Sequence, residues 1–237
     1  MKIEIWSDYV CPFCYIGKRR LEKALEDFPH KDKIDIEFKS FELDPNAKRD
    51  TDLTIYEILA KKYGMPVEEA KRMSAGVAKQ AAEVGLQFNF DTSIPTNTFD
   101  AHRLAKYAES KGKAKEMSER LLRSYFTESK HIGDKGYLKE LAVSLGLDSA
   151  EVEEVLTGDA YEKDVRFDQK EAREIGVQGV PFFVLNSKYA LSGAQPPEVF
   201  AEALSKVWEE ENEKPKLRNF ESKNKSETSY CSDDCCE

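Results

Sequence analysis

The segment "SDYVCPFCYIGKRRLEKAL" (residues 7–25) decides the fold class, because it joins a short strand to a helix through two cysteines. The residues before it, "KIEIW" (2–6), alternate polar and apolar side chains, which is typical of a strand. Apolar residues then recur at helical spacing, which predicts a helix from about Pro12 to Asp27. A second alternating run, residues 34–43, predicts another strand. The order strand, helix, strand indicates a βαβ unit with two parallel strands.

The middle of the chain has a different periodicity. Residues from about 53 to 175 show a helical pattern with several breaks, which predicts five to seven helices. Strand signals return in "PFFVL" (181–185) and "KYALS" (188–192), and the two residues between them predict a hairpin turn. A last helix is expected over about 197–210.

These patterns predict an α/β unit interrupted by a helical domain. The unit is made of residues 1–45 and 176–210, and residues 46–175 form the inserted helical domain. Residues 211–237 are rich in charged residues, serine and asparagine, and contain few apolar residues. Such a segment cannot bury enough apolar surface to fold alone, so we expect a flexible tail.

Composition excludes some classes of function. The net charge of −9 would repel a polyanion, so nucleic acid is not an expected partner. No apolar run approaches the roughly 20 residues that span a bilayer, so no membrane partner is expected. The first residues lack the features of a secretory signal, and we expect a cytoplasmic protein. In a reducing compartment, the five cysteines favour redox chemistry or metal binding over static disulfides.

The first cysteine pair is suited to thiol chemistry. Cys11 stands at a helix N-terminus, where free N–H groups and the helix dipole stabilise a thiolate. Pro12 suits the first helical position, which needs no N–H donor. Cys14 lies one turn further on, within reach of a mixed disulfide formed on Cys11. The spacing therefore predicts a dithiol–disulfide oxidoreductase with Cys11 as nucleophile and Cys14 as resolving thiol.

Two alternatives remain for this pair. Zinc needs about four ligands, and the three histidines, His30, His102 and His131, show no ligand spacing. We therefore expect no metal at Cys11 and Cys14. The pair could also be two buried structural thiols.

A late proline supports the redox interpretation. In "GVPFF" (179–183), Pro181 begins a strand, where its missing N–H costs no ladder bond. A cis bond between Val180 and Pro181 would leave the Val180 backbone free to pair with an extended substrate. Elsewhere, Asn97 or Thr98 is expected to cap a helix that begins with "FDAHRLAKYAES".

Longer strings carry a family resemblance. The segments "SDYVCPFCYIGKRRLEKAL", "PTNTFDAHRLAKYA", "HIGD" and "VQGVPFFVLNSKYALSGAQPPEVF" resemble the FrnE-like DsbA family oxidoreductases of bacteria, over about residues 1–208. The resemblance implies an α/β, thioredoxin-like fold with a large inserted α-helical domain. It implies that Cys11 attacks, that Cys14 resolves, and that Pro181 is a cis proline facing both.

The resemblance also implies where a substrate binds. We expect it in a groove between the two domains, where a family string on the helical domain faces the catalytic cleft. His102 could equally be a hydrogen-bonded surface residue that does not contact the substrate. The candidate substrate-binding residues are Pro12, Phe13, Asn97, Thr98, His102 and Val180.

Related proteins offer other functions. Kappa-type glutathione transferases and hydroxychromene carboxylate isomerases resemble this fold but carry serine in place of Cys11, whereas a cysteine pair favours electron transfer. No histidine separates the cysteines, so we expect weaker thiolate stabilisation than in a specialised oxidant. Reduction or isomerisation of protein disulfides is therefore expected, and a thioredoxin-like redox chaperone is a further alternative.

The expected partners follow from this chemistry. They are protein or small-molecule thiols and disulfides, together with a cytosolic thiol reductant. The redox-active Cys11–Cys14 disulfide needs no further cofactor, and a monomer and a homodimer both remain open.

The tail holds a second cysteine cluster, Cys231, Cys235 and Cys236. Some FrnE-like proteins resemble this chain in having a second cysteine pair near the C-terminus. The cluster could be a mobile dithiol shuttle for Cys11 and Cys14, a site for a soft metal such as zinc or copper, or functionally minor. A flexible linker of roughly 20 residues spans tens of ångströms, so reach does not exclude the shuttle.

Overall fold

The computed structural model describes residues 1–212. Most of the predicted tail, with Cys231, Cys235 and Cys236, lies outside the described residues, so the shuttle and soft-metal hypotheses stay predictions. Within the described part, no helix combines the length and apolarity needed to cross a membrane.

A four-stranded mixed sheet forms the base of the described structure, in the order β2-β1-β3-β4. The strands are β1 (Lys2–Ser7), β2 (Asp35–Ser40), β3 (Phe182–Leu185) and β4 (Tyr189–Ser192). Strands β1 and β2 are parallel, which confirms the βαβ unit, whereas β3 is antiparallel to both of its neighbours, β1 and β4. Three residues lie between Leu185 and its partner Tyr189, and two of them, Asn186 and Ser187, adopt φ 47° and 54°. The predicted hairpin is therefore confirmed, with a connection one residue longer than the predicted two.

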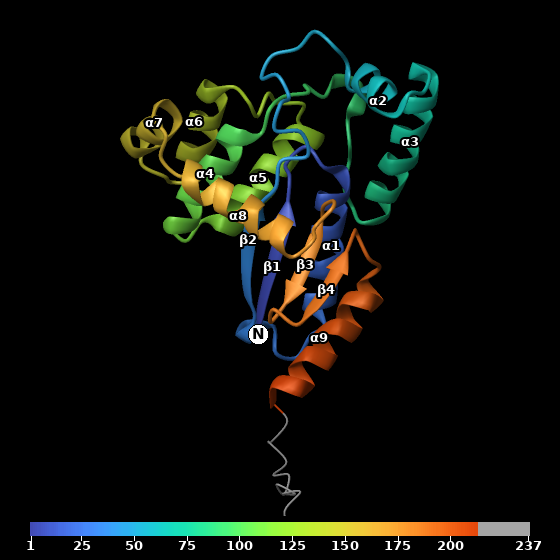
Figure 1. Cartoon of the computed structure of the whole chain (residues 1–237), viewed down its shortest axis with the longest axis vertical. Helices are drawn as coiled ribbons and strands as arrows, with labels where there is room; N and C mark the ends of the chain where they lie inside the picture. Colours follow the sequence, from blue (N-terminus) through green and yellow to red (C-terminus); the bar gives the residue numbers. More distant parts are fainter. Residues whose placement is uncertain (213–237) are drawn as a thin grey trace, which may run out of the picture.

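Helices cover both faces of this sheet (Figure 1). Helices α1 (Pro12–Glu26) and α9 (Pro197–Asn212) pack on one face. Alternation along β1 sends Ile3 and Ile5 into the core beneath these helices. On the other face, α8 (Glu162–Glu174) lies against Trp6, whose indole N–H donates to the Asp168 carbonyl at 2.9 Å.

The segment between β2 and β3 is helical, and its seven helices within the described residues agree with the expected five to seven. Its first six are α2 (Ile55–Tyr63), α3 (Val67–Glu83), α4 (Phe99–Ser110), α5 (Ala114–Phe126), α6 (Lys135–Ser144) and α7 (Ser149–Thr157). The seventh, α8, belongs to the insert by sequence but packs on the sheet. The α/β class with a helical insert is confirmed, while the expected domain boundaries stay predictions.

The core of the insert extends beneath the cysteine segment. Tyr9, Tyr15 and Ile16 belong to the same buried cluster as Leu104 of α4 and Leu121 of α5. The β1–α1 junction is therefore held between the sheet and the insert (Figure 1).

An ion-pair cluster strengthens this contact between α1 and α5. The Glu119 carboxylate accepts from the Tyr15 hydroxyl at 2.7 Å, binds the Lys18 ammonium at 2.6 Å and also pairs with Arg19. Burial would raise the pKa of Glu119, but these partners together lower it below its ordinary value.

Candidate active site

The two cysteines lie at the start of α1, as the sequence predicted. Cys11 is the N-cap residue in an extended conformation (φ −91°, ψ 111°), and Pro12 opens the helix. The Cys11 N–H donates to the Asp8 carbonyl at 3.2 Å, and the Cys14 N–H donates to the Cys11 carbonyl at 3.1 Å. The thiols are unbridged, with Cys11 4% and Cys14 2% exposed. Phe13, between them, is 39% exposed and presents an apolar surface beside the sulfurs.

The late proline lies against this cysteine pair. The Val180–Pro181 bond is cis, as expected. The Cys11 thiol donates to the Val180 carbonyl at an Sγ–O distance of 3.4 Å, across 169 positions of sequence. The structure thus brings together the two motifs that the sequence singled out separately.

Two glycines that the sequence reasoning missed hold Pro181 in place. The Gly193 N–H donates to the Pro181 carbonyl at 2.8 Å. Gly17 lies under the proline: a Cβ added there would be 3.0 Å from Pro181 Cγ and 3.3 Å from Phe183 Cζ. A glycine in the middle of a helix is the signal that could have found this approach, because it otherwise weakens the helix.

We expect Gly17→Ala to impair activity despite alanine's better helix propensity. The added methyl must displace Pro181 from its place beside Cys11, and overpacking of this kind costs about 1–3 kcal/mol. A misplacement of the reacting groups lowers the rate, and we expect roughly a tenfold loss of turnover in a disulfide reduction assay.

Gly76→Ala is the matched control for Gly17→Ala. Nothing lies within 4 Å of a Cβ at Gly76 in α3. This variant should gain up to about 1 kcal/mol of stability in a denaturant titration and keep full turnover. Equal turnover of the two variants would contradict the role given to Gly17.

A buried aspartate connects the cysteine loop to the insert. Asp8 is 1% exposed, and its carboxylate accepts from the Leu43 N–H at 2.8 Å. Its other oxygen lies 3.2 Å from His102 Nε2, and His102 is 2% exposed with its ring centre 4.7 Å from that of Tyr9, at an interplanar angle of 38°. The surface interpretation of His102 is therefore wrong: its burial places it behind the catalytic segment. Contact between His102 and substrate stays a prediction.

The neighbouring Asn97 and Thr98 organise a loop. Helix α4 begins at Phe99, and Asn97 Oδ1 accepts from the Phe99 N–H at 2.9 Å. The Asn97 amide also donates to the Pro45 carbonyl at 3.3 Å. Thr98 occupies the N-cap position, but its side chain makes no capping bond and is 4% exposed. The Asn97 contacts thus tie α4 to the loop after β2. Substrate binding by Asn97 and Thr98 stays a prediction.

Comparison with known proteins agrees with this geometry. Residues 2–205 match the family described as DSBA-like thioredoxin domain. The chain belongs to this family. It is 41% identical to a probable DsbA oxidoreductase from Streptomyces coelicolor, with a TM-score of 0.85 and 94% of each chain covered.

More distant relatives share the architecture. An uncharacterized protein, YwbO, from Bacillus subtilis is 29% identical over 86% of this chain and 95% of its own length. The cytosolic disulfide reductase DsbM from Pseudomonas aeruginosa is 17% identical, with a TM-score of 0.62, covering 88% of this chain and 98% of its own. At that identity the likeness shows the fold alone.

The two thiols of this DSBA-like chain have different surroundings. Burial, followed by the hydrogen bond and charge of Cys11, raises the pKa of Cys14 well above its ordinary value. The neighbouring Ser7 side chain and Asp8 backbone partly oppose this rise. In the reduced protein Cys14 is therefore the protonated partner, which must lose its proton before it can attack.

The site as described is built for thiol chemistry. Within residues 1–212, no group of three or more His, Cys, Asp or Glu side chains lies close enough together to hold a metal ion. What the geometry provides is a sulfur at a helix N-terminus, the Val180 carbonyl before cis-Pro181 against it, and a second buried sulfur one turn further along the helix.

Proposed function

We propose that this protein is a FrnE-like cytoplasmic thiol–disulfide oxidoreductase that reduces or isomerises disulfides of protein or small-molecule substrates. The observation that carries the proposal is the contact between Cys11 Sγ and the Val180 carbonyl beside cis-Pro181, with Cys14 buried in the same first turn. Membership of the DSBA-like family supports the reaction type.

The reaction proceeds in two exchange steps. The Cys11 thiolate attacks one sulfur of the substrate disulfide, which forms a mixed disulfide and releases the first substrate thiol. The Cys14 thiolate then attacks Cys11 Sγ, which forms the Cys11–Cys14 disulfide and releases the second substrate thiol. A cytosolic thiol reductant returns the two electrons to the enzyme.

We infer that the enzyme reduces disulfides, and does not form them, from the two residues between the cysteines. Pro12 and Phe13 carry no charge, so the partial positive charge that a histidine would add beside Cys11 is missing. Weaker stabilisation of the thiolate makes the disulfide form a poorer oxidant. A protein of the same fold is described as a cytosolic disulfide reductase, which agrees with this direction.

The test is the reduction potential of the Cys11–Cys14 pair, measured together with insulin reduction. We expect a potential of about −200 to −270 mV, in the range of glutaredoxins and thioredoxin, and catalysed reduction of insulin. A potential near about −120 mV would instead indicate an oxidant.

The isomerase alternative is separated by the Cys14→Ser variant. We expect this variant to lose insulin reduction, whereas an isomerase of the kappa or hydroxychromene carboxylate type needs no Cys14. Full isomerase turnover without disulfide exchange by the wild-type protein would refute the proposed function. The chaperone alternative predicts undiminished protection of unfolding proteins when both cysteines are serine.

A further inference from the structure

The resolving thiol poses a chemical problem that the proposed function leaves open. Cys14 is 2% exposed, and it must release a proton each time it attacks the mixed disulfide. The neighbouring Cys11 is also buried, at 4% exposed. The proton therefore has to leave through other groups.

Ser7 is placed to receive that proton. It is the last residue of β1 and 9% exposed. Alternation along β1 puts Ser7 on the same face as Ile3 and Ile5, which pack beneath α1. Its side chain consequently faces α1, close enough to Cys14 to lower the pKa of that thiol.

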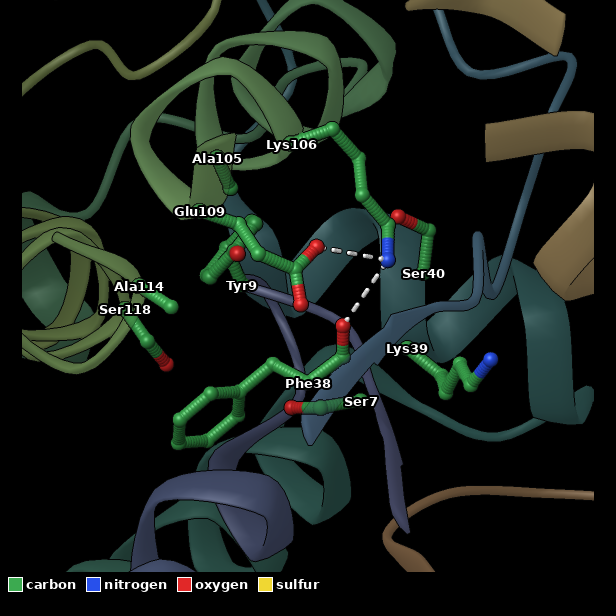
Figure 2. A pocket seen from close by; sticks show the side chains of 10 residues that line it. All are labelled: Ser7, Tyr9, Phe38, Lys39, Ser40, Ala105, Lys106, Glu109, Ala114 and Ser118. Carbon is green, nitrogen blue, oxygen red and sulfur yellow. Dashed lines mark hydrogen bonds and ion pairs between the residues drawn. The ribbon is translucent and has the colours of Figure 1, made fainter. Parts of the chain in front are cut away.

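A small cavity with both polar and apolar lining lies beside Ser7, between β1, β2, α4 and α5 (Figure 2). Its volume is about 10 Å³, which is room for about one water molecule. Its lining includes Ser7, Tyr9 and Ser40, together with Lys106 and Glu109 of α4. The cavity thus joins Ser7 to the charged residues Lys106 and Glu109 of the insert.

The polar neighbours of this cavity differ in their capacity to accept a proton. The charged and titratable groups around Cys14 and the cavity are Cys11, Asp8, Tyr9, Lys39, His102, Lys106, Glu109 and Asp168. Both Asp8 oxygens are engaged, one by the Leu43 N–H and the other by His102. Tyr9 keeps its own proton, because burial, followed by the Asp8 charge, raises its pKa.

Lys106 and Glu109 form an ion pair in which only Glu109 is substantially exposed. Burial alone would lower the pKa of Lys106, but the Asp168 carboxylate 2.8 Å away raises it, so Lys106 stays a cation. Its ammonium also binds Glu109 at 3.1 Å and the Phe38 carbonyl at 3.1 Å (Figure 2). The Glu109 side chain is 34% exposed, so this carboxylate touches both the cavity and bulk water.

We propose that Ser7 and this cavity form the route by which Cys14 passes its proton to Glu109 during the resolving step, an inference that rests on the proposed function. Ser7 takes the Cys14 proton as its own hydroxyl proton moves to a water in the cavity, and that water protonates Glu109. The Cys14 electron pair forms the bond to Cys11 Sγ, and the bond from Cys11 to the substrate sulfur breaks. The substrate leaves as a thiolate, and Glu109 returns the proton to solvent.

The experiment is a two-phase release assay with equimolar dithiobisnitrobenzoate. The full-length chain carries serine at Cys231, Cys235 and Cys236, so that only Cys11 and Cys14 react. Attack by Cys11 releases the first thionitrobenzoate, and resolution by Cys14 releases the second. The first phase reports the proposed function, and the second reports the proton route.

We expect Ser7→Ala to leave the first phase unchanged and to slow the second about tenfold near neutral pH. Glu109→Gln should slow the second phase several-fold, and the difference should shrink as the pH rises, because hydroxide then takes the proton. Ser40→Ala is the matched control: it removes another hydroxyl from the same cavity and should leave both phases unchanged.

Three outcomes would overturn the route. A normal second phase in both Ser7→Ala and Glu109→Gln would overturn it while leaving the proposed function intact. A slowing in Ser40→Ala equal to that in Ser7→Ala would attribute the effect to a disturbed cavity. Absence of the first phase in the chain with both Cys11 and Cys14 would overturn the proposed function and the route together. Glu109 is partly exposed, so its variant carries the test if Ser7→Ala does not fold.

Discussion

Replacing Cys11 with serine is expected to lower the rate of disulfide reduction by more than about a thousandfold. A serine hydroxyl ionises far less readily than a thiol, and it cannot form a mixed disulfide. The remaining thiol within the described residues, Cys14, lies one turn further into α1 and has a raised pKa, so it cannot take over the attack. The measurement is kcat/KM for insulin reduction, with the wild-type protein in parallel.

Cys14→Ser is the matched control for Cys11→Ser, because it removes the other sulfur of the same helical turn. This variant should still attack the substrate and then stall, so a mixed disulfide on Cys11 should accumulate and be visible by mass spectrometry. Comparable thermal stability of the two variants would show that the loss is chemical.

Substantial turnover by Cys11→Ser would contradict the assignment of the nucleophile. Any residual activity must first be tested against the three further thiols of the tail, Cys231, Cys235 and Cys236. Residual activity that disappears when these are also replaced would show that the tail attacks substrate directly.

The elements of this fold were predictable where the signal is local. Alternation in "KIEIW", the Cys-Pro step at a helix start and the short turn between two late strands each specify their own geometry. The proline motif was also recognisable, because few positions in a strand accept a residue without an N–H. These local signals are sufficient to single out Cys11, Cys14 and Pro181 as site residues without knowledge of the contacts between them.

The supporting residues were not predictable, because their roles depend on distant partners. His102 has the spacing of an ordinary helical residue, and its burial follows from Asp8, 94 positions earlier. Gly17 matters through Pro181, and Ser7 through Cys14 and a cavity completed by Glu109. The packing of α8 on the sheet likewise depends on Trp6, far away in the sequence. A single sequence contains no local pattern for such pairs.

The second large effect is expected on stability, at Gly133 in the "HIGD" string. A Cβ at this position would lie 2.0 Å from Thr96 Oγ1 and 3.2 Å from the Asn97 carbonyl, so the surrounding loops would have to move. Thr96 Oγ1 donates to the Arg49 carbonyl at 2.7 Å and lies 3.1 Å from His131 Nε2. We therefore expect Gly133→Ala to cost about 3 kcal/mol in the free energy of unfolding, measured by denaturant titration.

A double-mutant cycle with Thr96→Ala isolates the steric cause. Thr96→Ala alone should cost about 1–2 kcal/mol, because it removes the bond to the Arg49 carbonyl. It also removes the oxygen nearest to the new methyl, so the double variant should be destabilised by less than the sum of the two single changes. Strict additivity would mean that the methyl of Gly133→Ala does not meet Thr96. The loss would then have to arise from the Arg49 and Asn97 contacts, 3.1 and 3.2 Å from the added carbon.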